Sequence, residues 1–179
     1  MAMKILTLYL LVVISTDFIS LFCPTYAGTN FWIYHLFTLF EYIFLTAAFI
    51  LMQKGTTAKL IFKISIAVFT TIWIAAKLMF ENPGQFDSIT LTLASVFLVG
   101  ISAFTLIDIS RRGTGSLIKL PLFWYSVAVL IYFSGNIVVF AISRAGFLWQ
   151  VHAVINILFL IILGVSFICH RFRSTTYGP

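Results

Sequence analysis

A small set of polar residues, most of them ionisable, could carry chemistry in a chain that is otherwise strongly apolar. Ionisable side chains inside a bilayer cost about 2.5–3.5 kcal/mol at its centre, and they usually face a cavity or the interior of a helix bundle. We therefore interpret the set as the lining of a ligand-binding pocket in the outer half of a membrane. Its members are Asp17, His35, Glu41, Lys77, Asn136, His152 and Asn156.

Glu41 has the strongest case for a function. It follows Trp32 by nine residues, which places it near the middle of a membrane-spanning helix at a rise of about 1.5 Å per residue. No Lys or Arg is close to it in the sequence, so a carboxyl group there must be protonated or paired. We predict that Glu41 is the centre of an outward-opening pocket. The alternative is that it only bonds a neighbouring helix.

His35 and His152 occupy matching positions, because each follows an interfacial tryptophan, Trp32 or Trp149, by three residues. At this depth a histidine is typically an interfacial or interhelical hydrogen-bonding residue. In the predicted pocket, both line the route to the carboxyl group. Imidazole is also a ligand for haem and copper, so a haem or metal held by the two histidines is a further alternative.

Two acidic residues have candidate basic partners. Asp17 and Lys77 lie on segments that run in the same direction and at similar depths, so we predict that they form a buried ion pair. Asp108 lies beside Arg111 and Arg112 near the opposite interface, where a solvated pair is expected.

Motifs typical of membrane enzymes do not occur in the sequence. It has no HExxH zinc motif and no GxSxG nucleophile motif, and three histidines are too few for the histidine boxes of a di-iron enzyme. The glycine-rich segment from Arg111 to Ser116 follows no predicted strand, which argues against a phosphate-binding loop. We expect a non-enzymatic protein without a metal or other cofactor.

The elements that must position these residues are membrane-spanning helices. Of the 179 residues, 61% are hydrophobic and 9% are charged, whereas soluble domains carry about 25% charged residues. We predict an all-α, polytopic integral membrane protein, a six-transmembrane-helix bundle that forms a single domain over residues 1–179. The predicted helices are 4–23, 31–52, 59–80, 86–110, 120–143 and 149–170, each long enough to cross roughly 30 Å of hydrocarbon.

The distribution of charge predicts the orientation. Cytoplasmic loops carry an excess of Lys and Arg, and most basic residues fall on one side of the predicted helices, whereas the third loop carries Glu81 and Asp87. We predict a multi-pass protein of the cell membrane with both termini in the cytoplasm. Basic residues in short loops suit anionic lipid headgroups, and no nucleic-acid partner is expected. The basic side comprises Lys4, Lys54, Lys59, Lys63, Arg111, Arg112, Lys119, Arg171 and Arg173.

The position of the polar residues favours one function over another. They concentrate in the predicted outer half, whereas the inner half is nearly all Leu, Ile, Val and Phe. This pattern favours an outward-facing binding or sensing module that acts through a partner membrane protein or a homo-oligomer. The alternative is a small proton-coupled transporter that uses Glu41, which would need polar groups in both halves. A weak echo, in which Trp32 and His35 recur as Trp149 and His152, leaves open a duplication of the first and last hairpins.

Overall fold

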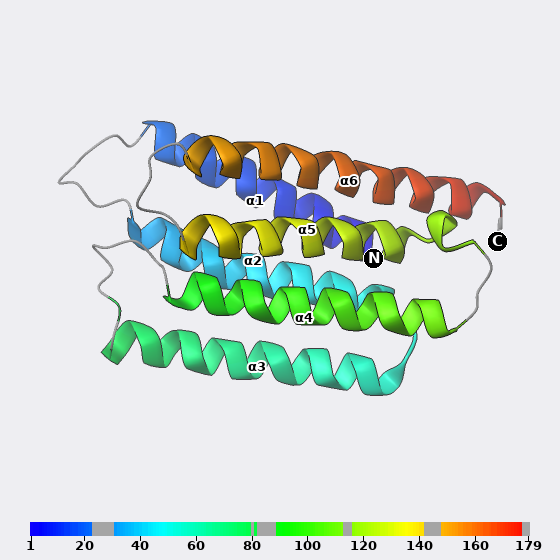
Figure 1. Ribbon diagram of the computed structural model, residues 1–179, viewed down its shortest axis with the longest axis horizontal. Coiled ribbons are helices and arrows are strands. Elements are labelled where there is room, and N and C mark those ends of the chain that lie inside the picture. The colour runs from blue at the N-terminus through cyan, green and yellow to red at the C-terminus, as the bar shows by residue number, and fades with distance from the viewer. Residues whose placement is uncertain (23–30, 80, 82–88, 113–115, 142–147, 177–179) are drawn as a thin grey trace. The chain divides into compact units, whose positions relative to one another are not determined.

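The computed structural model describes residues 1–22, 31–79, 81, 89–112, 116–141 and 148–176, and the elements within these ranges are helices (Figure 1). The side chains at 17–22, 31–32, 140–141, 148–150 and 173–176 lie outside the description. The elements are α1 (Ala2–Phe22), α2 (Phe31–Met52), α3 (Thr56–Met79), α4 (Ile89–Arg111), the short 3₁₀ helix η1 (Leu117–Lys119), α5 (Pro121–Ala141) and α6 (Leu148–Thr176).

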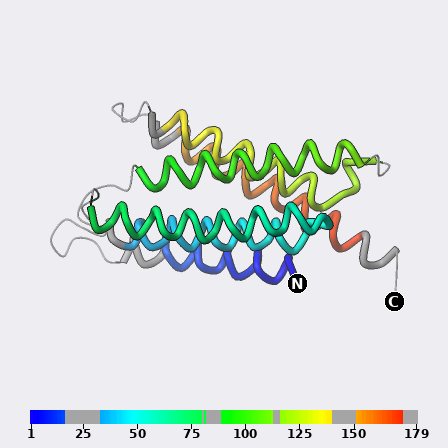
Figure 2. Tube along the Cα trace, turned by 90° about the horizontal axis from the view of Figure 1, so that it is seen from below, coloured from blue at the N-terminus to red at the C-terminus, as the bar shows by residue number. Residues whose placement is uncertain are grey.

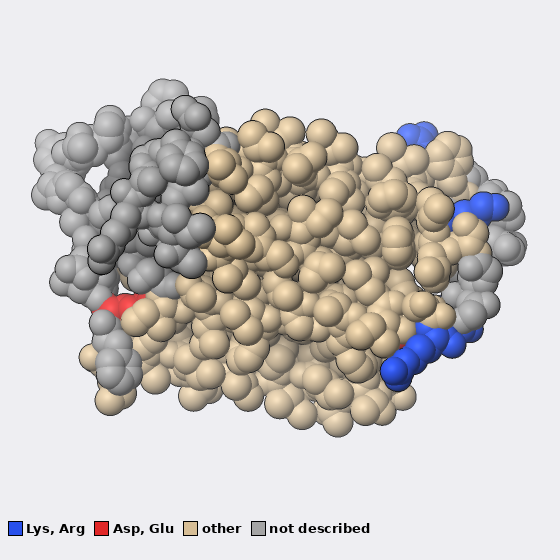
Figure 3. All heavy atoms as spheres, in the orientation of Figure 1, with Lys and Arg blue, Asp and Glu red and all other residues tan. Residues whose placement is uncertain are grey.

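The prediction of an all-α membrane protein is confirmed in its general form. Five helices are long and apolar enough to cross a membrane, over Ile33–Met52, Thr56–Met79, Ile89–Arg111, Pro121–Val139 and Val151–Phe172. The described apolar part of α1, Ala2–Thr16, is shorter, so the sixth span stays a prediction. On the face drawn in Figure 3, uncharged atoms cover the surface between the helix ends, as contact with hydrocarbon requires.

Besides small shifts in helix bounds, such as the start of α3 at Thr56 where residue 59 was predicted, two features differ from the predicted helices. Residues 117–119 lie between two predicted helices, but they form η1, in which Leu120 N–H donates to the Leu117 carbonyl at 2.9 Å. The indole Nε1 of Trp124 donates to the Ile118 carbonyl at 2.7 Å, which fixes η1 to the first turn of α5. In addition, α6 continues to Thr176, past its predicted end. The change from apolar to basic residues marks a membrane boundary and does not by itself end a helix.

The chain forms two compact units, Met1–Ala94 and Ser95–Pro179. In the first unit, α2 packs against both α1 and α3 and runs antiparallel to both, as Figures 1 and 2 show. In the second unit, α5 packs along α6, and η1 contacts α5. Because α2 has a neighbour on each side, its polar residues meet partners from two helices.

Aromatic contacts set the register of α2 against α3. The ring centroids of Tyr42 and Phe69 are 4.1 Å apart, and those of Phe49 and Phe62 are 6.1 Å apart. All four side chains are buried. In an antiparallel pair, this register brings the start of α2 next to the end of α3, so candidate residues at those two ends become neighbours.

A glycine lies at the contact between α5 and α6. A Cβ atom added at Gly135 would lie 2.6 Å from Cδ1 of Ile155, closer than real side chains approach. Small residues let helices approach closely in membranes. The same two helices are joined near their other ends, where the Ser166 hydroxyl donates to the Pro121 carbonyl at 2.9 Å.

We expect both termini to lie in the cytoplasm, because most of the basic residues fall on that side. In a cysteine-free background, single cysteines at Thr29, Asp87 and Gly146 should react with a membrane-impermeant maleimide added to intact cells. A cysteine at Thr57 is the control and should react only after permeabilisation. Reaction at Thr57 in intact cells, together with protection at the other three positions, would invert the topology.

Candidate functional site

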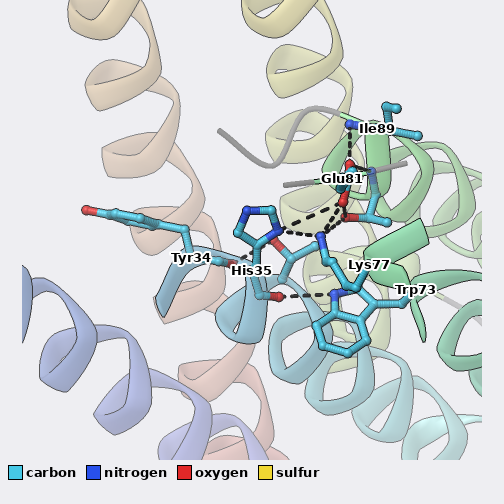
Figure 4. Close-up of polar contacts among 8 residues, drawn as sticks. Tyr34, His35, Trp73, Lys77, Glu81 and Ile89 are labelled. Carbon is cyan, nitrogen blue, oxygen red and sulfur yellow. Dashed lines mark hydrogen bonds and ion pairs between the residues drawn. The ribbon is translucent and has the colours of Figure 1, made fainter. Parts of the chain in front are cut away.

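Lys77 is the centre of a buried polar cluster at the end of α3. Its ammonium group donates to Glu81 Oε2, to His35 Nδ1 and, at 2.9 Å, to Thr90 Oγ1. The ammonium group also lies 5.4 Å from the ring centroid of Trp73, a cation–π contact. Figure 4 shows the Lys77 side chain directed toward His35 and Glu81. We call these five residues the Lys77 cluster.

Three helices contribute to the Lys77 cluster, and local spacing explains part of the arrangement. Lys77 and Glu81 are one helical turn apart, a spacing at which side chains meet on a helix. The Glu81 N–H donates to the Ala76 carbonyl at 2.8 Å, a type of bond common where helices end. From α2, the His35 backbone is held by Trp73, whose Nε1 donates to the His35 carbonyl at 3.1 Å. The Tyr34 side chain points away from the cluster (Figure 4).

Glu81 ties the cluster to the start of α4. Its Oε1 accepts the backbone N–H groups of Ile89 and Thr90, both at 3.0 Å, and its Oε2 accepts the Thr90 hydroxyl at 3.0 Å. The first N–H groups of a helix have no partner within the helix, and a carboxylate also offsets the positive end of the helix dipole. Glu81 therefore acts as an N-terminal cap for α4 from outside that helix.

Lys77 and Glu81 form a true ion pair. Burial alone would raise the pKa of the Glu81 carboxyl group, but the bonds from Lys77 and Thr90 and the positive charge of Lys77 outweigh it, and the pKa lies below its ordinary value. Glu81 is therefore ionised at neutral pH. The Lys77 and Glu81 side chains are only 12% and 6% exposed, so solvent weakens the attraction little.

The contact with Lys77 determines the tautomer of His35. An ammonium group only donates hydrogen bonds, so His35 Nδ1 must accept, and the neutral ring carries its hydrogen on Nε2. Glu81 Oε2 lies 3.9 Å from the same Nδ1. Adding a proton to Nδ1 would remove the acceptor for Lys77 and create a cation beside Glu81. His35 can therefore exchange one charged partner for the other.

Glu41 lies in the interior of the first unit, and its hydrogen-bond partner among the described residues is uncharged. It is 4% exposed, and its Oε1 accepts the Tyr9 hydroxyl at 2.8 Å. Tyr9, on α1, is itself buried. The structure thus joins α1 to α2 through a buried carboxyl–hydroxyl bond, and an outward-opening pocket at Glu41 stays a prediction.

In the second unit, Asn136 and His152 join α5 to α6. His152 Nδ1 lies 3.0 Å from Asn136 Oδ1. An amide oxygen only accepts, so this ring carries its hydrogen on Nδ1, the opposite tautomer from His35. Asn136 is buried, whereas His152 and Asn156 are partly buried. These residues belong to a different unit from His35 and Glu41, so a pocket that contains both sets stays a prediction.

The structure brings together only some of the predicted site residues. His35 and Lys77 are in contact, and Glu41 lies further along α2. Asp17 falls within α1, but its side chain lies outside the description, so its pair with Lys77 stays a prediction. The expected pair of Asp108 with Arg112 is confirmed, and its side chains are 26% and 28% exposed.

Sequence reasoning missed three members of the Lys77 cluster. Glu81 is not among the predicted site residues, although its spacing of four residues from Lys77 predicts an ion pair. Trp73 also shares a helix face with Lys77. Thr90 follows in the next helix, and the sequence offered no signal for its contact, which depends on how α3 and α4 meet.

The cluster combines an ammonium group, a carboxylate, an imidazole and a hydroxyl group. The described residues contain no group of three or more His, Cys, Asp or Glu that could hold a metal ion. Lys77 already occupies Nδ1 of His35, so a metal at this ring would have to use Nε2. Comparison with protein-family models, curated proteins and solved structures finds no significant match to this chain.

Removal of one partner from the Lys77–Glu81 pair should lower the free energy of unfolding more than removal of both partners. Lys77→Met or Glu81→Gln alone leaves a buried charge unpaired, which costs about 3 kcal/mol. The double variant should lose clearly less than the sum of the single losses in a double-mutant cycle on unfolding of the purified protein. The matched control is the other pair of the same spacing, Asp108→Asn with Arg112→Gln, whose coupling should stay below about 1 kcal/mol because it is more exposed. Additive losses at Lys77 and Glu81 would contradict the pairing.

Proposed function

We propose that this chain is a non-enzymatic sensing module of the cell membrane that responds to protons, or to a small polar ligand, at the Lys77 cluster. One observation carries the proposal: a single buried ammonium group is shared by His35, Glu81 and Thr90. These partners come from α2, from the end of α3 and from α4. A change at one partner therefore alters the packing of all three helices.

The response begins at His35. Histidine is the side chain whose ordinary charge change falls between pH 5 and 8. A proton on Nδ1 excludes Lys77 as a donor to that atom and attracts Glu81, which is 3.9 Å away. The carboxylate then divides its hydrogen bonds between the imidazolium and its previous partners. Protonation of one ring nitrogen of His35 therefore changes the hydrogen bonds of the whole Lys77 cluster.

The consequence reaches α4 through Glu81. Its Oε1 caps the first N–H groups of that helix, and loss of an N-terminal cap costs about 1 kcal/mol. A difference of that size changes the ratio of two conformations roughly fivefold. We infer that movement at the start of α4 is passed to a partner membrane protein or to a second copy of this chain.

Trp73 offers a direct measurement of the response, because its indole bonds His35 and its ring contacts Lys77. In a variant that keeps Trp73 as its single tryptophan, reconstituted in lipid nanodiscs, indole emission should shift between pH 8 and pH 5. His35→Gln should abolish this shift. The matched control, His152→Gln, should leave it intact because His152 belongs to the second unit.

A loss of stability at acid pH distinguishes the contribution of Glu81 from that of His35. Because the pKa of Glu81 lies below its ordinary value of 4.5, its stabilising contribution is complete above that pH and is lost as the pH falls below it. His35→Gln should keep this loss of stability in acid, and Glu81→Gln should remove it. An emission shift between pH 8 and 5 that survives His35→Gln would overturn the proposed sensing role.

Proton-coupled transport is a second candidate, favoured by buried polar residues of α2 that continue beyond Glu41. Thr46 is 0% exposed, and Gln53, which directly follows the end of α2, is 2% exposed, so buried polar positions continue to the end of this helix. For a transporter, we expect net proton flux into sealed proteoliposomes under an imposed pH gradient, and loss of that flux in Glu41→Gln. Equal flux in protein-containing and empty liposomes would contradict transport and leave sensing as the function.

A further inference from the structure

A row of buried polar residues on α2 connects the Lys77 cluster with Glu41. His35, Thr38 and Glu41 are spaced three residues apart, and their exposed fractions are 4%, 3% and 4%. Residues three apart on a helix are neighbours on its surface, with Cβ atoms about 5–6 Å apart. The row therefore leads from a charged cluster at the helix end to a carboxyl group near the middle of the span.

The partner of Glu41 suits a carboxyl group that gains and loses a proton. The Tyr9 hydroxyl donates to Oε1 at 2.8 Å, and a hydroxyl can donate to a carboxylate as well as to the carbonyl oxygen of a neutral acid. An ionised carboxylate in a span normally has a cation or several donors around it. In the described part of the chain, the partner recorded for Glu41 is this neutral hydroxyl.

We infer that Glu41 is a proton-binding site that is loaded from the Lys77 cluster through Thr38. The inference rests on the proposed sensing function and names an internal site for the sensed proton. It assigns Thr38 a positioning role in proton transfer. The ligand is the proton itself.

The transfer is balanced in atoms and charge. An imidazolium at His35 gives a proton to the Thr38 hydroxyl oxygen, while that hydroxyl breaks its bond to the Tyr34 carbonyl, turns and gives its own proton to Glu41. His35 returns to the neutral form, the carboxylate becomes a neutral acid, and no bond between heavy atoms changes. Thr38 Oγ1 donates to the Tyr34 carbonyl at 3.0 Å, which leaves its lone pairs available as acceptors.

The charged and titratable groups that face this row come from both neighbours of α2. From α1, Tyr9 bonds Glu41. From α3 and its C-terminal end, Lys77 and Glu81 contact His35. The Asp17 side chain lies outside the description. Both charged neighbours are thus at the His35 end of the row, where protons enter, and the Glu41 end has a neutral partner.

Infrared difference spectroscopy of the protein in zwitterionic lipid nanodiscs tests this inference. A pH jump from 8 to 5 should produce the C=O stretching band of a neutral carboxyl group, and Glu41→Gln should remove that band. Thr38→Val keeps the shape of the side chain and deletes the hydroxyl, so it should slow the appearance of the band by about tenfold or more. The matched control is Thr46→Val, another buried threonine of α2, which should keep the wild-type rate.

Each result decides between the two proposals. If the infrared band persists in Glu41→Gln, the proton site at Glu41 is overturned. If the band appears at the wild-type rate in Thr38→Val, the route through Thr38 is overturned. Both conclusions hold even when the Trp73 emission shift is intact. If the protein with an intact Lys77 cluster shows no Trp73 emission shift between pH 8 and pH 5, the sensing function is overturned. The proton site is still supported in that case, provided that the infrared band depends on Glu41 and appears more slowly in Thr38→Val. Retained helical circular dichroism and a monodisperse elution profile confirm that each variant is folded.

Discussion

The buried charge of Lys77 is the constraint on which the polar architecture of the first unit depends. An ammonium group at 12% side-chain exposure is stable only when its charge is balanced and its donors are used. Glu81 supplies the balancing charge, and His35 and Thr90 supply neutral acceptors. Since these groups come from different helices, the positions of the three helices at this end are coupled through one side chain.

The helix α2 connects that charged end to a different environment. Near its start, His35 lies among ionised groups, whereas further along Glu41 meets the neutral hydroxyl of Tyr9. Directly after Glu41 the helix is held by aromatic packing of Tyr42 on Phe69. In the proposed function, the packed middle of α2 stays in place while the hydrogen bonds at its His35 end change on protonation.

The length of the apolar runs predicted the helices of the fold, because it reflects the cost of placing polar groups in hydrocarbon, whereas the orientation that the charges predict stays a prediction. Neither pattern could predict η1, which depends on the bond from Trp124 to the Ile118 carbonyl. Among the site residues, depth and helix face singled out His35 and Glu41. The partner of Glu41 depends on the register between α1 and α2, and the contact of Thr90 depends on the turn between α3 and α4, so neither follows from one helix alone.

The central claim is that His35 accepts a hydrogen bond from Lys77 and is therefore neutral, with its hydrogen on Nε2, before it senses a proton. Solid-state nitrogen NMR of protein labelled with ¹⁵N-histidine in lipid bilayers measures this directly, with His35→Gln used to assign the signals. At pH 8, Nδ1 of His35 should be unprotonated and correlated in space with the Lys77 ammonium nitrogen. On acidification to pH 5, Nδ1 should become protonated and that correlation should weaken. A hydrogen on Nδ1 at pH 8, or an unchanged ring at pH 5, would contradict the account.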